Sequence, residues 1–161
     1  MAGDSGVIVA INVSPGGVPK LPVPSARVSA EGLDGDGQRD KRHHGGPDRA
    51  LCLYSVERIE ALQGEGHRIV PGATGENLTV RGLDWTAMLP GARLQTGAVT
   101  MEITGFASPC KNIRPYFADE DSTRISQKVH PGWSRVYARV LGEGELRVGD
   151  ALTLVARAPQ E

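Results

Sequence analysis

Glycine and proline punctuate this chain so densely that long helices have little room to form. The sequence holds 21 Gly and 11 Pro among 161 residues, and short runs rich in valine, isoleucine, leucine and threonine stand between them. Short β-branched runs bounded by turn-forming residues are typical of strands. The pattern therefore predicts many short strands joined by tight turns.

The apolar runs predict one clear helix and a series of strands. Ser55–Gln63 places apolar residues at helical spacing, with Ser55 as the N-cap and Gly64 as the stop. Pro115 is expected to interrupt the segment Cys110–Val129, and one or two further helical turns are expected in Ser122–Val129. Hairpin turns are expected at Thr96-Gly97 and Gly142-Glu143-Gly144. The predicted strands are Gly6–Ser14, Ala26–Ala30, Ala50–Tyr54, Glu76–Val80, Ala92–Gln95, Ala98–Thr104, Ser134–Leu141 and Ala151–Ala156.

Many antiparallel strands with one or two short helices predict a mainly β fold, a closed or nearly closed β-barrel. The length fits a single domain, residues 1–161, with a core over about 7–154. A net charge of −1 gives no basic excess for nucleic acid or an anionic membrane. No apolar run approaches the roughly 20 residues of a membrane span. We find no secretory signal and no disulfide framework, so the expected location is the cytoplasm.

The segment Gly32–Asp48 has no apolar periodicity and is predicted to be a long loop. A basic cluster in a nearly neutral protein favours an anionic ligand such as a phosphate, and Gly45-Gly46 would let backbone N–H groups approach it. A solvated charged loop is the slightly favoured alternative on composition alone. Adjacent histidines point opposite ways in extended chain, so one of the two would face a site. The basic side chains are Arg39, Lys41, Arg42, His43, His44 and Arg49.

The two cysteines stand in contrasting surroundings. Cys110 follows a predicted strand, and its basic neighbours Lys111 and Arg114 would favour the thiolate, which is a soft metal ligand and a sulfur nucleophile. An inert buried cysteine is an equally good interpretation. Cys52 is flanked by leucines in a predicted strand and is interpreted as structural. A disulfide between the two is open on spacing but is not expected in the cytosol.

Several segments together resemble the MOSC family, the domain named after the C-terminal part of molybdenum-cofactor sulfurases. They occur in family order from about Val7 to Leu154, and two of them, His44–Asp48 and Gly75–Leu78, are specific in combination. The segments that carry the resemblance are Gly17–Lys20, Gly35–Asp40, His43–Ala50, Pro71–Leu78, Ser108–Ile113, Gly132–Arg139 and Gly149-Asp150.

The resemblance implies a barrel like the pyruvate kinase barrel domain, and a molybdenum cofactor of the molybdopterin type. The family cysteine falls on Cys110, which the resemblance makes the metal ligand and the catalytic residue. Cationic and backbone donors would serve the phosphate or the pterin of the cofactor. The implied cofactor-binding residues are Lys20, Arg39, Arg42, His43, His44, Gly45, Thr74, Gly75 and Asn77.

The resemblance implies two functions and leaves open whether the chain is an enzyme. Some relatives are reductases of small N-hydroxylated substrates, and an electron donor protein feeds their molybdenum. In the sulfurases a pyridoxal-phosphate cysteine desulfurase domain supplies sulfur, so a non-catalytic carrier of cofactor or persulfide is the alternative. Since this chain has no room for such a domain, pyridoxal phosphate would enter only through a separate partner. A barrel that has lost the cofactor is a third, weaker alternative.

Overall fold

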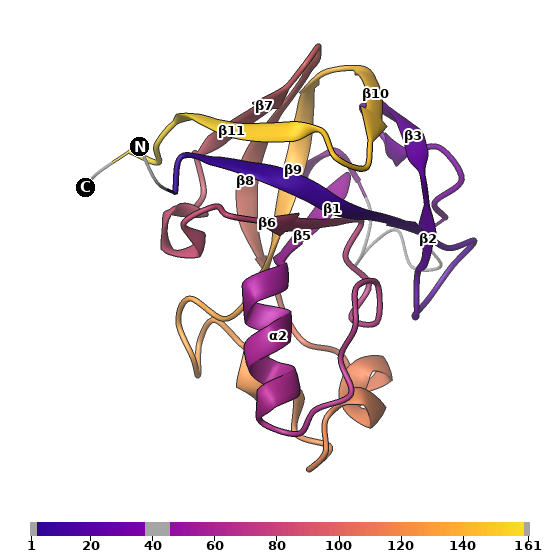
Figure 1. Ribbon diagram of the computed structural model, residues 1–161, viewed down its shortest axis with the longest axis vertical. Helices are drawn as coiled ribbons and strands as arrows, with labels where there is room; N and C mark the ends of the chain where they lie inside the picture. The colour runs from indigo at the N-terminus through magenta and orange to yellow at the C-terminus, as the bar shows by residue number, and fades with distance from the viewer. Residues whose placement is uncertain (1–2, 38–45, 160–161) are drawn as a thin grey trace.

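The computed structural model describes residues 3–37 and 46–159, and its main element is a ring of strands (Figure 1). The strands of this sheet are β1 (Ser5–Val13), β2 (Leu21–Val23), β5 (Leu51–Ser55), β6 (Leu78–Arg81), β7 (Arg93–Thr96), β8 (Val99–Ala107), β9 (Arg135–Gly142) and β11 (Ala151–Ala156). Their order is β11-β7-β8-β9-β5-β6-β1-β2, and β1 also pairs with β11. That last pairing closes the ring and confirms the predicted mainly β barrel.

A second sheet of three short strands lies beside the barrel. It consists of β3 (Ser25–Ser29), β4 (Gly32–Leu33) and β10 (Gly144–Arg147), in the order β10-β3-β4. The predicted hairpin at Gly142-Glu143-Gly144 is therefore wrong, because β10 leaves β9 and pairs with β3 instead. The Glu143 carboxylate also accepts a hydrogen bond from the backbone N–H of Ala30, which ties this turn to the end of β3.

One neighbouring pair in the barrel runs parallel, which the sequence did not predict. Leu53 of β5 lies opposite Leu78 of β6 in a parallel ladder, whereas the other barrel pairs are antiparallel. A parallel pair needs a crossover connection, and the helix α2 (Val56–Gly64) supplies it below the barrel (Figure 1). This is the predicted helix, shifted by one residue. The Ser55 side chain caps it by accepting from the Arg58 N–H.

The remaining helical segments in the described residues are short 3-10 turns. The expected helical turn within Ser122–Val129 is one of them, and Pro115 lies inside another instead of ending it. Such turns are common as connectors. The segments are η1 (Pro47–Arg49), η2 (Trp85–Ala87), η3 (Lys111–Tyr116) and η4 (Ser122–Ile125).

Strands β5 and β9 separate the barrel core from the segments packed outside it. Leu51 and Leu53 alternate with Cys52 along β5, so the leucines and the cysteine point to opposite faces. Both leucines belong to the buried apolar core, together with their partners on β9, Ala138 and Val136. On the opposite face, Cys52 of β5 and Arg135 of β9 are also buried, whereas Arg139 and Leu141 further along β9 are exposed.

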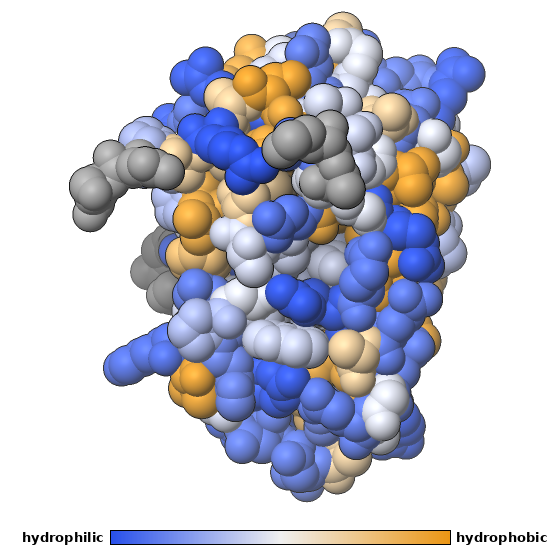
Figure 2. Space-filling view, turned by 60° about the vertical axis from the view of Figure 1, so that its left-hand side comes forward, coloured by the Kyte–Doolittle hydropathy of each residue, from blue (hydrophilic) through white to orange (hydrophobic). Residues whose placement is uncertain are grey.

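Apolar side chains are scattered over the face of the molecule that Figure 2 draws. Figure 2 shows several separate hydrophobic patches among hydrophilic residues on the face that it draws. Across the residues the structure describes, no helix combines the length and the apolar character needed to cross a bilayer.

Glu76 is a buried carboxylate that holds the loop before β6 in place. Its two oxygens accept hydrogen bonds from the Gly72 N–H and from the hydroxyls of Thr74 and Thr79, each at 3.0 Å. Burial raises the pKa of the Glu76 carboxyl above its usual range, although these hydrogen bonds oppose the shift. The folded protein therefore favours the neutral form of Glu76 more than the unfolded chain does.

This imbalance predicts how stability depends on pH. Because the pKa of Glu76 is raised in the folded protein, this carboxyl makes its full contribution to the free energy of unfolding below pH 4.5, its ordinary pKa. The contribution is lost as the pH rises through the pKa of the folded protein. Above pH 4.5 the free energy of unfolding of the wild type should therefore fall relative to that of Glu76→Gln. Urea denaturation at a series of pH values measures the difference. The exposed Glu145→Gln should keep the wild-type profile, and a pH-independent difference between wild type and Glu76→Gln would refute the assignment.

Candidate functional site

A cavity of about 300 Å³ opens on the outer face of the β5–β9 pair. Cys52 and Tyr137 are direct partners in that pair and share this face, and Arg135 lies two residues from Tyr137 on the same side. The loop after β1, the segment before β6 and the segment after β8 form the other walls. Segments distant in sequence therefore meet around a single hollow.

Five of the predicted site residues line this cavity. They come from three walls and are Lys20, Thr74, Gly75, Asn77 and Cys110. The predicted residues Arg39, Arg42, His43, His44 and Gly45 lie outside the described residues. Arg49, at the end of the same basic cluster, is described and lines the cavity. It also stacks on the ring of Tyr137 at 5.1 Å.

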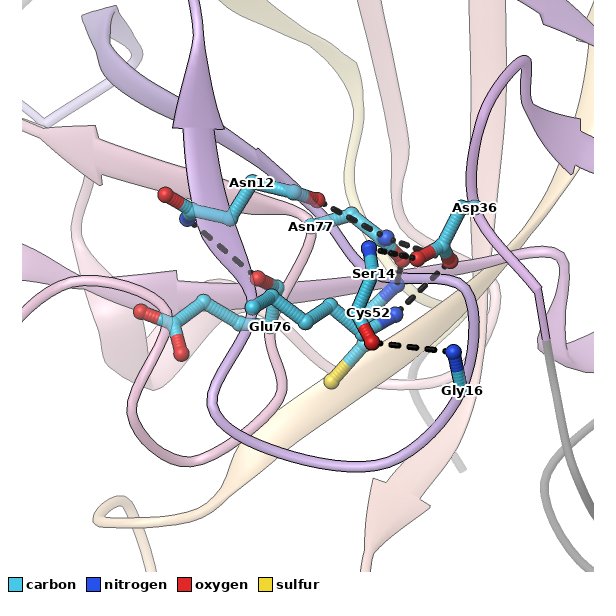
Figure 3. Close-up of polar contacts among 8 residues, drawn as sticks. Asn12, Ser14, Gly16, Asp36, Cys52, Glu76 and Asn77 are labelled. Atoms are coloured by element: carbon cyan, nitrogen blue, oxygen red, sulfur yellow. Dashed lines mark hydrogen bonds and ion pairs between the residues drawn. The ribbon is translucent and has the colours of Figure 1, made fainter.

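Asp36 is the centre of a polar cluster beside the cavity (Figure 3). One of its carboxylate oxygens accepts from the Ser14 N–H at 3.0 Å, and the other accepts from Lys20 Nζ at 2.7 Å and from Asn77 Nδ2 at 2.9 Å. The side chains of Lys20 and Asp36 are only 10% and 4% exposed. The charge of Lys20 is therefore balanced within the protein, and the sulfur of Cys52 points away from this cluster (Figure 3).

The Asn77 side chain connects walls of the cavity, while the Thr74 side chain bonds within its own segment. Asn77 Oδ1 accepts from the Cys52 N–H at 3.0 Å, while its amide nitrogen donates to Asp36 and to the Asn12 carbonyl. The Thr74 hydroxyl donates to Glu76. These two predicted ligand donors thus already have partners inside the protein. Gly75 contributes backbone instead, at a φ of +92° that favours glycine.

Arg135 is the site residue that the sequence reasoning missed. It is 6% exposed and lines the cavity, and its terminal nitrogens donate to backbone carbonyls. Its Nε is buried and has no hydrogen-bond partner, and no carboxylate of the described residues forms an ion pair with it. Alternation with Tyr137 along the predicted strand was the signal that could have revealed it. A buried guanidinium of this kind favours an anionic ligand in the cavity.

Both cysteines face the cavity, but they differ in burial. Cys52 is 7% exposed, and burial raises the pKa of its thiol to about 11, although the charge of Arg135 opposes the shift. Its predicted burial is confirmed, yet its side chain lines the cavity wall, while the neighbouring leucines point into the core. Cys110 is partly exposed, and both thiols are free. The cations that line the cavity with Cys110 are Lys20, Arg49 and Arg135, not the predicted Lys111 and Arg114.

This arrangement predicts selective reaction of one thiol. Cys110 should react with iodoacetamide before Cys52 in cofactor-free protein, because a thiolate is the reactive form and Cys52 is buried with a raised pKa. A shift from 9.0 to about 11 leaves Cys52 with about a hundredfold less thiolate at neutral pH than an unperturbed thiol. Peptide mass spectrometry of timed samples measures both rates.

Matched serine variants provide the control. Cys52→Ser should destabilise the fold by on the order of 1 kcal/mol, because it buries a hydroxyl, whereas Cys110→Ser should leave stability nearly unchanged. Equal labelling of the two thiols would remove the distinction between them.

Comparison with known proteins assigns the chain to a family. The MOSC domain family profile matches residues 40–153. YflK of Bacillus subtilis is 32% identical over 143 residues, 88% of this chain and 64% of YflK. YiiM of Escherichia coli is 31% identical over 149 residues, 89% of this chain and 65% of YiiM. This chain therefore spans less than two thirds of either relative.

A solved structure supports the same assignment. The crystal structure of YiiM from Geobacillus stearothermophilus matches with a TM-score of 0.69 at 27% identity, over 94% of this chain and 75% of the YiiM chain. Profile, relatives and fold agree, and the chain belongs to the MOSC domain family.

Proposed function

We propose that the cavity binds a molybdenum cofactor of the molybdopterin type, with Cys110 as the protein ligand of the metal. One observation carries the proposal: the buried, incompletely bonded guanidinium of Arg135 and the partly exposed thiol of Cys110 open to the same cavity. A guanidinium suits an anionic group, and a thiolate suits a soft transition metal. A ligand that carries an anionic group together with a soft metal would use both side chains.

The residues present fit the charge and the chemistry of this cofactor. Arg49 and Arg135 would place positive charge beside its phosphate, and the backbone at Gly75 would face the polar edge of the pterin. A cavity of about 300 Å³ is at the lower end of the usual range for small-molecule sites. Arg39, Arg42, His43, His44 and Gly45 belong to the proposal as further donors, on the family resemblance alone.

The proposed activity is reduction of a small N-hydroxylated substrate with electrons from a protein partner. When bound, the metal centre supplies the redox chemistry. The chain itself would supply the thiolate of Cys110 as ligand and a positive wall at Arg49 and Arg135. The proposal includes a cytoplasmic location, since both thiols are free and cytosolic thiols stay reduced.

A carrier of cofactor or persulfide sulfur is the second candidate, and the partial exposure of Cys110 favours it. A donor such as a cysteine desulfurase could reach this thiol, and pyridoxal phosphate would act only in that partner. The two candidates differ in turnover. A reductase consumes electron donor whenever substrate is present, whereas a carrier transfers its cargo once.

Protein made in a host that synthesises the cofactor should co-purify with molybdenum, and oxidation should release a fluorescent pterin. Metal analysis and chromatography measure both. Cys110→Ser should lose most of the molybdenum, while Cys52→Ser should retain it, because only Cys110 would donate sulfur to the metal. If wild-type protein from such a host contains neither metal nor pterin, cofactor binding is refuted for both the reductase and the carrier.

A further inference from the structure

Arg135 lies beside the cavity, at the point where strand β8 ends and strand β9 begins. It is the first residue of β9, and its backbone partner is Ala107, the last residue of β8. From there its Nη2 donates to the carbonyl oxygens of Ala107 and Ser108, both at 3.3 Å. Cys110 follows two residues later, before η3 begins. The guanidinium thus holds the backbone that leads directly to the partly exposed thiol of Cys110.

The same guanidinium also reaches the opposite wall. Its Nη1 donates to the carbonyl oxygen of Thr74 at 2.5 Å. The Thr74 hydroxyl is in turn bonded to Glu76, which also accepts from the Gly72 N–H. A single buried side chain therefore joins the segment that leads to Cys110 to a loop fixed on β6.

Arginine suits this position for reasons of geometry and charge. Its planar group offers five N–H donors in a fixed fork, whereas lysine offers one ammonium and glutamine one neutral amide. The positive charge of Arg135 is stabilised by carbonyl dipoles and not by a carboxylate. The charge is therefore not neutralised at the cavity wall. The charge of Arg135 opposes the burial that raises the pKa of Cys52, which lines the same cavity.

We infer that Arg135 is the positioning residue for Cys110, because it clamps the Ala107–Ser108 carbonyls and the Thr74 carbonyl across the cavity. The inference rests on the proposed role of Cys110 as a metal or sulfur ligand. Arg135 itself need not touch the metal. Its effect passes through the backbone of Ser108 to the thiol.

The test compares Arg135→Gln, Arg135→Lys and Arg58→Gln with wild type in cofactor-free protein. Arg58 is the matched control, because its guanidinium also donates to a loop carbonyl, that of Gly132. It stacks on the ring of Trp133 and does not line the cavity. Hydrogen exchange of the amides in 107–113 is measured against exchange in β5, with urea denaturation as the measure of global stability.

Arg135→Gln should speed exchange in 107–113 by about tenfold or more beyond any change in β5, because local opening replaces the clamp. Arg135→Lys keeps the charge and can reach one wall, so it should rescue exchange to within about threefold of wild type. In protein from a cofactor-competent host, Arg135→Gln should also lose molybdenum, whereas Arg58→Gln should retain it.

Three results would overturn the inference. They are unchanged exchange in 107–113 for Arg135→Gln, equal effects of glutamine and lysine, and faster exchange in 107–113 that only follows a global loss of stability. If Arg135→Gln does not fold, the incomplete rescue by Arg135→Lys is the test: its exchange in 107–113 should be faster than in Arg58→Gln, by no more than about threefold, and equal rates would overturn the inference. Cofactor binding is tested separately, by the molybdenum content of wild type and Cys110→Ser.

Discussion

The pairing of β5 with β9 is the constraint on which both the core and the site depend. Because side chains alternate along a strand, one face of this pair gives Leu51, Leu53, Val136 and Ala138 to the barrel core, and the other gives Cys52, Arg135 and Tyr137 to the cavity. A shift of β9 by one residue would turn Val136 and Ala138 toward the cavity and drive the guanidinium of Arg135 into the core. The same hydrogen-bonded ladder therefore fixes the fold and orients the site.

A strand pair covered on both faces must satisfy its buried polar groups internally, and this protein does so with side chains that bridge segments. Asp36 gathers Ser14, Lys20 and Asn77, while Glu76 gathers Gly72, Thr74 and Thr79. The Asp36 cluster joins segments that are distant in sequence, whereas the Glu76 cluster fixes the loop before β6 locally. In the described residues this leaves Arg135 Nε and Asn12 Oδ1 as the buried side-chain polar atoms without a partner. The first of them belongs to a residue that lines the cavity.

Much of the fold could be predicted from the sequence, because turn residues and apolar runs act locally. The helix after β5, the strand Ala151–Ala156 and the barrel class follow from those signals. The parallel β5–β6 pair and the departure of β10 to β3 could not be predicted, since strand partners are set by long-range packing. At the site, motif positions indicated Lys20, Thr74, Gly75, Asn77 and Cys110. They gave no sign that Asn77 and Lys20 are bonded to Asp36, or that Cys52 turns away from its leucine neighbours to face the cavity.

The central claim is that Cys110 donates its sulfur to a cofactor metal in this cavity. X-ray absorption spectroscopy at the molybdenum edge, on protein isolated with its metal, tests it most directly. Wild type and Cys52→Ser should give the same spectrum, and whatever molybdenum Cys110→Ser retains should show one sulfur scatterer fewer. Superimposable spectra for wild type and Cys110→Ser at equal metal content would contradict the claim.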